Sequence, residues 1–274
     1  MTVRVPATSA NLGPGFDVMG LALSLHCEVG IVGTDVAPDG AHECEDTHPA
    51  QVAFVRAGGT GTVWVKNTIP MGRGMGFSGA VRVAGIIAAE QQASNGAWDR
   101  ATSRALAIGT ELEGHADNVA PSLFGGVVIA SGEHVVNVPI ALNPVFVMWV
   151  PDFTTSTNES RGKIGPSIAL EDAVFNIAHT AMFVTALQTG DVPLLREATK
   201  DRIHQDIRLA ASPACAAALQ AGLDAGAWCG WLSGSGPTVA LMCDPAMADA
   251  VAAALPSDGH AKKLTIDFDG AVVL

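Results

Sequence analysis

A glycine-rich loop between a strand and an apolar helix constrains the fold of this chain more than any other feature. The sequence PMGRGMGFSGA occupies residues 70–80. An alternating run typical of a strand precedes it at residues 62–66, and an alanine-rich run typical of a buried helix follows at 80–93. Alternate glycines let a backbone approach a bulky ligand, and the first helical turn offers unpaired N–H groups to phosphate. The loop therefore predicts either a phosphate cradle or a tight turn before a buried helix.

Two side chains of this loop carry chemistry of their own. The hydroxyl of Ser78 is placed to meet Mg²⁺, and the guanidinium of Arg73 is placed to meet phosphate oxygens. The G-x-x-x-x-G-K-[ST] spacing of a Walker A loop is absent from this segment. We therefore expect a phosphate site of another type if the loop binds a nucleotide.

Composition narrows the class of protein. Apolar residues make up 49% and charged residues 15% of the 274 residues, so the chain can bury a sizeable core. The 15 Lys and Arg against 27 Asp and Glu give a formal charge of −12, which disfavours nucleic acid as a partner. The five cysteines are scattered, and no apolar run is long enough to span a membrane. We expect a soluble, cytoplasmic protein with no nucleic-acid or membrane partner.

Strands and helices interleave along the chain without strict β-α-β alternation, which predicts an α+β fold. The acidic, polar stretch at residues 37–60 is interpreted as a surface connection. The best candidate for a domain boundary lies near Asn143 and Pro144, although no flexible linker marks this position. Helices are expected at residues 80–93, 100–113, 170–189, 194–209, 213–223 and 245–254.

A second candidate element is the sequence ELEGHADN at residues 111–118. It gathers oxygen ligands of the kind Mg²⁺ prefers, together with possible proton acceptors. Glu111 and Glu113 end a predicted helix, where a carboxylate is electrostatically unfavourable, and this favours a functional reason for their presence. The alternative is an ordinary polar helix end.

Two further segments and two arginines have a structural and a functional interpretation. The loop at residues 7–17 and the glycine-rich turn at 233–237 suit either ligand-lining loops or simple turns. Arg161 and Arg208 follow polar loops in a chain that is poor in cations. Each is either a solvated surface arginine or a clamp for a carboxylate ligand.

Taken in order, these motifs resemble the GHMP small-molecule kinases, and among them the branch that phosphorylates L-homoserine. PATSANLGPGFD at residues 6–17 is similar to the first motif of that branch, and residues 70–80 are similar to the family's P-x-x-x-G-L-G-S-S-A loop. The similarity runs from residue 3 to about residue 242 and so covers nearly the whole chain. The later similar segments are EGHADNVAPSLFGG at 113–126, STNESR at 156–161, DRIHQDIR at 201–208 and LSGSGPT at 232–238.

The resemblance implies both a fold and a reaction. Residues 1–143 would form an ATP-binding domain related to the second domain of ribosomal protein S5, and residues 144–274 a ferredoxin-like domain. The reaction would be phosphoryl transfer from ATP, with Mg²⁺, to the hydroxyl of L-homoserine, giving O-phospho-L-homoserine for threonine biosynthesis. A homodimer is also expected from the resemblance.

The resemblance also implies roles for individual residues. Asp117 would accept the hydroxyl proton, with Asn118 beside it, and Ser78 would bind Mg²⁺. The second metal ligand would be a carboxylate at the helix end, either Glu113 or Glu111. Residues that would wrap the ATP phosphates are Pro70, Met71, Gly72, Arg73, Gly74, Met75, Gly76, Phe77, Ser78, Gly79 and Ala80. Residues that would line the amino-acid pocket are Asn11, Asp17, His115, Asp117, Asn118, Thr157, Arg161 and Arg208.

Physical chemistry fits that assignment and leaves two alternatives. Homoserine is a zwitterion, so Arg161 and Arg208 offer forked donors to its carboxylate and Asp17 offers a counter-charge to its ammonium. Phe77, which stands where the family usually has serine, would add bulk beside the phosphates. The alternatives are a GHMP kinase for another small hydroxylated acid or amino acid, and a non-catalytic relative that binds ligand through the same fold.

Overall fold

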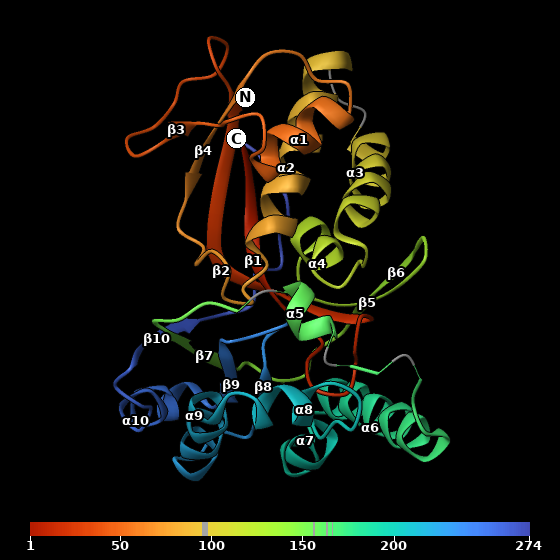
Figure 1. Cartoon of the computed structure of the whole chain (residues 1–274), viewed down its shortest axis with the longest axis vertical. Helices are drawn as coiled ribbons and strands as arrows, with labels where there is room; N and C mark the ends of the chain where they lie inside the picture. The colour runs from red at the N-terminus through yellow and green to blue at the C-terminus, as the bar shows by residue number, and fades with distance from the viewer. Residues whose placement is uncertain (95–97, 156, 163, 166) are drawn as a thin grey trace.

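The computed structural model describes residues 1–94, 98–155, 157–162, 164–165 and 167–274, with side chains for all of these except 94 and 157–159. The described residues form two antiparallel sheets, each covered by helices on one face, and the two layered halves meet at the middle of the molecule (Figure 1). The interleaved helices and strands make this an α+β fold, as the sequence predicts.

The first sheet is built from strands before residue 144 and one strand from the end of the described chain. Its strand order is β11-β1-β2-β4-β3, and β2 also pairs with β5, which in turn pairs with β6. The long strand β2 is therefore the centre of this sheet. The strands are β1 (Val3–Ala10), β2 (Met19–Ile31), β3 (His42–Glu43), β4 (Val63–Asn67), β5 (Val127–Ser131), β6 (His134–Val138) and β11 (Val272–Val273).

The helices of residues 49–124 cover one face of this sheet (Figure 1). Small residues let them pack closely: a Cβ on Gly85 would lie 2.4 Å from the carbonyl oxygen of Ala50. The central helix α2 is therefore buried between the sheet and its neighbours, as its alanine-rich sequence predicts. The helices are α1 (Pro49–Arg56), α2 (Phe77–Ser94), α3 (Trp98–Glu113) and α4 (Val119–Phe124).

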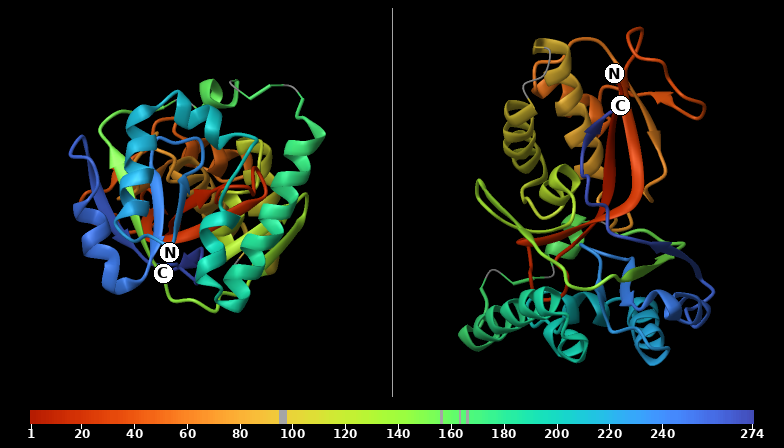
Figure 2. Two further views of the ribbon diagram at one scale, coloured as in Figure 1. Left: turned by 90° about the horizontal axis from the view of Figure 1, so that it is seen from below. Right: turned by 180° about the vertical axis from the view of Figure 1, so that it is seen from behind.

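The second sheet has the order β10-β7-β9-β8, with helices on its far side (Figure 2). A short helix, α5 (Thr157–Gly162), lies between the two halves of the molecule (Figure 1). The strands are β7 (Val145–Pro151), β8 (Cys229–Leu232), β9 (Val239–Cys243) and β10 (Gly259–Leu264). The helices are α6 (Leu170–Thr189), α7 (Val192–Ala198), α8 (Gln205–Ala210), α9 (Pro213–Asp224), η1 (Pro245–Met247) and α10 (Ala248–Ala253).

The chain does not divide cleanly at residue 144. After β10 it returns to the first sheet, where β11 pairs with β1 and Val273 lies opposite Val3. His26 Nε2 and Asp267 Oδ2, 2.6 Å apart, tie the returning segment to β2. The division at 143/144 separates the strands of the two sheets except for β11, and the domain boundary itself stays a prediction.

Two sequence expectations are wrong. Residues 37–60 are not only a connection, because they contain β3 and helix α1, whose Ala50, Ala53 and Phe54 are buried at helical spacing. The expected helix over 194–209 is two helices, α7 and α8. Between them a carboxylate oxygen of Asp201 accepts backbone N–H groups of residues 203, 204 and 205, which turns the chain.

Two observations bear on the expected environment of the protein. All five cysteines are buried and unpaired. Within the described part of the chain, no helix combines the length and apolarity that crossing a bilayer requires.

Candidate active site

The three glycine-rich segments of the sequence come together where the two halves meet. The backbone N–H of Thr8 donates to the carbonyl of Met75 at 3.2 Å, which joins the first segment to the second. The hydroxyl of Ser233 donates to the carbonyl of Gly74 at 2.6 Å, which joins the third to the second. The N–H of Gly234 donates to Ala10 at 3.1 Å and closes the set. Segments more than 200 residues apart in sequence therefore form one wall.

The loop at 70–80 requires its glycines for this approach. Gly74 and Gly76 have φ values of +72° and +67°. A Cβ on Gly74 would lie 2.2 Å from the Ser233 carbonyl oxygen, and one on Gly76 would lie 1.8 Å from the Thr8 hydroxyl. These contacts fix the path of the loop and leave the first turn of α2 beyond it.

A cavity of about 150 Å³ opens beside this loop and the first turn of α2. The side chains of Phe77 and Ser78 belong to that turn, and both residues line the cavity. The ring of Phe77 also lies edge-on to His48, with 6.0 Å between ring centroids. The unpaired N–H groups at the start of α2 and the positive end of its dipole make this side of the cavity favourable for anions.

Most predicted site residues line this one cavity, and three of the described ones do not. Met71 is exposed, Ala80 is buried in the core, and Glu111 lies on the surface. The side chain of Thr157 lies outside the described residues. The predicted residues that line the cavity are Asn11, Asp17, Pro70, Gly72, Arg73, Gly74, Met75, Gly76, Phe77, Ser78, Gly79, Glu113, His115, Asp117, Asn118, Arg161 and Arg208.

The structure separates the two glutamates that the sequence left as alternatives. Glu113 lines the cavity and pairs with Arg82, with only 12% of its side chain exposed. Glu111 points elsewhere and pairs with Arg56 at 2.9 Å, with 58% of its side chain exposed. Residues two apart in a helix face different directions, which explains the separation. Gly114 then ends α3 with a φ of +83°, in agreement with its predicted role.

Beyond α3, a tight polar turn places a carboxylate in the cavity. Asp117 is buried, and its Oδ1 lies 2.5 Å from Nδ1 of His115 and accepts a bond from the Asn118 amide at 3.3 Å. The hydroxyl of Thr8 in turn donates to the Asn118 amide oxygen at 2.7 Å. Burial lowers the pKa of His115, but the hydrogen bond and charge of Asp117 outweigh it, so the pKa is raised.

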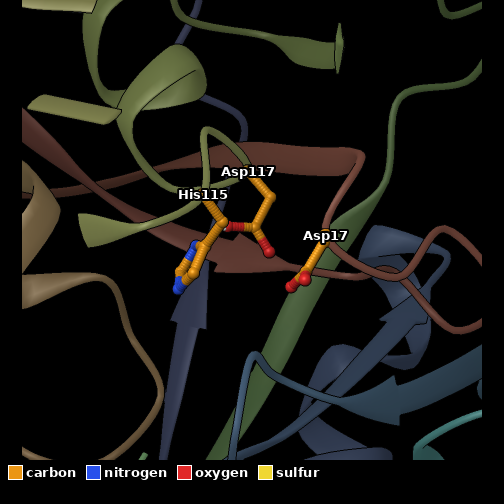
Figure 3. Close-up of side chains that lie close together, drawn as sticks. All are labelled: Asp17, His115 and Asp117. Carbon is orange, nitrogen blue, oxygen red and sulfur yellow. The ribbon is translucent and has the colours of Figure 1, made fainter. Parts of the chain in front are cut away.

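Asp17 faces this turn from the first glycine-rich segment. Asn11, Leu12 and Asp17 all have positive φ, which is strained for residues other than glycine. The Asn11 side chain holds the loop, because its oxygen accepts the Asp17 N–H and its nitrogen donates to Gly234. Figure 3 shows Asp17 approaching Asp117 and His115 from a different part of the chain.

Oxygen and nitrogen atoms of Asp17, His115 and Asp117 all lie within 4.8 Å of one another, a spacing that could hold a cation. The hydroxyl of Ser78 and the carboxylate of Glu113 belong to residues that also line this cavity. The lining therefore contains further oxygen atoms of the kind that a hard cation prefers.

The two candidate arginines both line the cavity but are held differently. Arg161 donates two hydrogen bonds, of 2.8 and 2.7 Å, to the carboxylate of Asp17, and this partner raises the pKa of Arg161. Arg208 is buried and donates to the Gly234 carbonyl at 3.1 Å and to Nδ1 of His204 at 3.0 Å. Burial, then the charge of Arg161, lowers the pKa of Arg208.

Sequence reasoning assigned no individual role to two residues that line the site, Phe16 and Thr155. Phe16 stacks on His204 and lies 5.5 and 5.6 Å from the guanidinium carbons of Arg161 and Arg208, so it packs against both arginines. Thr155 lines the cavity one residue before the motif at 156–161. Both lie in or beside motifs already identified, and that position is the signal that could have found them.

One expected contact takes a different form. The guanidinium of Arg73, expected to meet phosphate, donates to the carbonyls of Pro151 and Asp152 at 2.9 and 3.0 Å. It therefore fastens the glycine-rich loop to the end of β7, while the residue still borders the cavity.

Comparison with protein families and curated proteins finds relatives along the whole chain. Residues 47–126 match the family model described as GHMP kinases N terminal domain, and residues 183–261 match GHMP kinases C terminal. The chain is 37% identical over 306 residues to a homoserine kinase of Desulfitobacterium hafniense, covering 99% of both. It is 38% identical to a homoserine kinase of Streptomyces avermitilis, covering 99% of this chain and 95% of that one.

Solved structures agree with these relatives. A homoserine kinase from Cytophaga hutchinsonii superposes with a TM-score of 0.85 at 26% identity, covering 100% of this chain and 97% of that one. A mevalonate kinase from Methanococcus jannaschii superposes with a TM-score of 0.70 at 11% identity, covering 97% and 98%. The second likeness shows the fold alone.

Proposed function

The chain belongs to the homoserine kinase family of the GHMP kinases, and we propose that it transfers the γ-phosphoryl group of ATP to the hydroxyl of L-homoserine. The product would be O-phospho-L-homoserine, for threonine biosynthesis. One observation carries the proposal beyond family membership: a single cavity joins a glycine-rich, anion-favouring wall to two arginines and an aspartate suited to a zwitterion. Phosphoryl transfer needs positioning and charge neutralisation more than covalent help, and this cavity supplies both.

The nucleotide side of the cavity fits ATP and Mg²⁺. At Gly74 and Gly76 a Cβ would collide with the backbone or side chains behind the loop, so this glycine wall keeps its shape beside the first turn of α2. Ser78 and Glu113 contribute the hydroxyl and carboxylate oxygens that Mg²⁺ prefers. Bound there, Mg²⁺ would neutralise phosphate charge. We propose Glu113 and not Glu111 as the carboxylate ligand, because only Glu113 lines the cavity.

On the acceptor side, the amino-acid groups of homoserine have matched partners. The guanidinium groups of Arg161 and Arg208 would bind its carboxylate, and the carboxylate of Asp17 would bind its ammonium. Since Asp17 and Arg161 are paired with each other in the free protein, substrate with both charges leaves neither of them unpaired. A substrate with only one of these charges would lack that compensation.

The reaction forms a bond from the homoserine oxygen to the γ-phosphorus and breaks the bond to the ADP oxygen. The hydroxyl proton passes to a carboxylate oxygen of Asp117, which is buried and held by His115 and Asn118. Because the transition state is loose, this proton transfer contributes less than alignment of the two substrates.

We also propose a cellular setting and an organisation. The five buried, unpaired thiols suit the reducing cytoplasm. A homodimer and the division at 143/144 rest on the family resemblance. In this division residues 1–143 supply the glycine-rich loop at 70–80 and the start of α2, and residues 144–274 supply both arginines.

The proposed function is tested by measuring ADP release with L-homoserine, L-serine, L-threonine and mevalonate as acceptors. We expect kcat/KM to be highest for L-homoserine, by at least about tenfold, because L-serine has a shorter hydroxyl arm and mevalonate lacks the ammonium. The Ser78→Ala variant serves as the control for contaminating kinases. Equal use of mevalonate, or no ADP release with any acceptor, would overturn the proposal.

A further inference from the structure

A partly buried ion pair joins Arg82 to Glu113, which lines the cavity, and the pair has no role in the function proposed so far. Arg82 Nη1 donates to Glu113 Oε1, and 20% and 12% of the two side chains are exposed. Arg82 lies four residues after Ser78 in α2, on the same helix face. Helical side chains lean toward the N-terminus of their helix, and in α2 that end follows the glycine-rich loop.

Glu113 depends on this cation. It is the last residue of α3, where the negative end of the helix dipole disfavours a carboxylate, and it is mostly removed from water. Arg82 depends on Glu113 in return: its Nε is buried and has no hydrogen-bond partner among the described residues. Either charge left alone here would be costly, so each must keep an opposite charge beside it.

We propose that Arg82 is a positioning residue that occupies Glu113 in the free protein and makes divalent-metal binding there conditional on the nucleotide. This inference rests on the proposed function, in which Glu113 binds the metal. Without nucleotide, a metal ion at Glu113 would leave Arg82 half-buried and unpaired. With nucleotide bound, phosphate oxygens supply a new anionic partner for Arg82, and Glu113 becomes free for the metal.

This exchange keeps every charge paired before and after binding. In the free protein Arg82 pairs with Glu113; in the complex Arg82 would pair with phosphate and Glu113 with the metal. Metal and nucleotide therefore bind with positive coupling, since each removes the cost that the other would meet alone. The arrangement also stops Glu113 from collecting a metal ion in the absence of ATP.

A second ion pair, two residues before Glu113 in α3, provides a matched control for the Arg82–Glu113 pair. Arg56 and Glu111 form an equivalent pair from α1 to the same end of α3, but 51% and 58% of their side chains are exposed. Water already solvates both charges there, so removing Arg56 should free no metal site.

The test measures Mn²⁺ binding to the protein by electron paramagnetic resonance, with and without a non-hydrolysable ATP analogue. For the wild type we expect weak Mn²⁺ binding alone and tighter binding with the analogue. For Arg82→Met we expect Mn²⁺ to bind at least about tenfold more tightly without nucleotide, and the enhancement by the analogue to shrink by a similar factor. Adding Glu113→Gln to Arg82→Met should abolish the gained site, and Arg56→Met should match the wild type.

Two results would overturn the inference: equal Mn²⁺ affinity of wild type and Arg82→Met without nucleotide, or a wild type that binds Mn²⁺ as tightly alone as with the analogue. Thermal unfolding verifies that Arg82→Met is folded, and Arg82→Lys, which keeps the charge, should behave close to the wild type. These readouts do not use homoserine, so a failure of the proposed acceptor specificity would leave them unchanged and can be recognised separately.

Discussion

Arg208 and Arg161 line the same cavity, but the two regions that carry them differ in how deeply they bury the guanidinium and in how they hold it. Arg208, on α8, is 6% exposed and is fixed by the Gly234 carbonyl and His204. Arg161, on α5, has 44% of its side chain exposed, is hydrogen-bonded by Asp17 and packs on Phe16. One guanidinium is built into the wall, and the other is held by a partner that substrate can replace.

The difference shows that two residues with the same chemical role need not contribute equally to substrate binding. A buried guanidinium has already lost its water, so a ligand carboxylate gains the full strength of the contact. The exposed guanidinium of Arg161 must exchange the Asp17 carboxylate for the substrate carboxylate, and this exchange contributes less to the free energy of binding. We therefore expect Arg208 to dominate carboxylate recognition and Arg161 to add discrimination for the zwitterion.

The largest expected effect is that of Arg208→Ala. Truncation leaves a substrate carboxylate, the Gly234 carbonyl and His204 without their donor. We expect kcat/KM for L-homoserine to fall by about 200-fold or more, since losing one partner of a buried charge pair costs on the order of 3–5 kcal/mol. Steady-state kinetics measure the loss, and the dissociation constant for ATP should change little. A loss smaller than that of Arg161→Ala would reverse the comparison.

A similar contrast in side-chain exposure separates Glu113, which is partly buried, from the exposed Glu111. Glu113→Gln, like Ser78→Ala, should lower kcat on the order of 100-fold, because a charge-stabilising ligand at the phosphates is lost. Glu111→Gln removes only an exposed pair with Arg56 and should change kcat less than about threefold. Turnover at saturating substrate compares the three variants. If Glu111→Gln were the more harmful change, the assignment of the metal ligand would be wrong.

Arg161→Ala should lower kcat/KM for L-homoserine by about 30-fold, less than Arg208→Ala. A methyl ester of homoserine sharpens the comparison, because it lacks the carboxylate charge. The wild type should strongly prefer the acid, and each arginine variant should prefer it less. If the variants discriminated between acid and ester as well as the wild type does, neither arginine would bind the carboxylate.

The smallest expected effect is a pH dependence of stability. The folded protein raises the pKa of His115, so the stabilisation from its pair with Asp117 is complete below about pH 6.5 and is lost as the pH rises through the folded value. His204 has the opposite sign: burial lowers its pKa, so it destabilises the fold as the pH falls below about 6.5.

Thermal unfolding at several pH values checks this. The difference in melting temperature between wild type and His115→Asn should be largest near pH 6 and should shrink toward pH 9. Asp117→Asn should remove most of that pH dependence. A difference that grew with pH would mean that the pair does not favour the protonated histidine.

The sequence was sufficient to find the walls of the site, because glycine-rich segments leave a strong local signal. It predicted α6 (Leu170–Thr189) to the residue and the end of α3 at Gly114. It could not separate Glu111 from Glu113, since that choice depends on how α3 is rotated against the rest of the molecule. The role of Arg82 was invisible for the same reason: its partner lies on a different helix.

Other failures have local causes. Helix α1 was missed because its three buried apolar residues lie within a polar stretch of sequence. The break between α7 and α8 was missed because Asp201 competes for backbone N–H groups, and this competition is decided by the surrounding structure. Propensity alone favoured one continuous helix there.

The return of the chain to its first sheet sets an order of events during synthesis. Strand β1 carries the first glycine-rich segment into the site, yet its outer neighbour β11 comes from residues 272–273. Until these residues have been synthesised, β1 has an open edge at Val3 and Arg4. This edge of the first sheet is therefore paired only when the two ends of the described chain lie side by side (Figure 1).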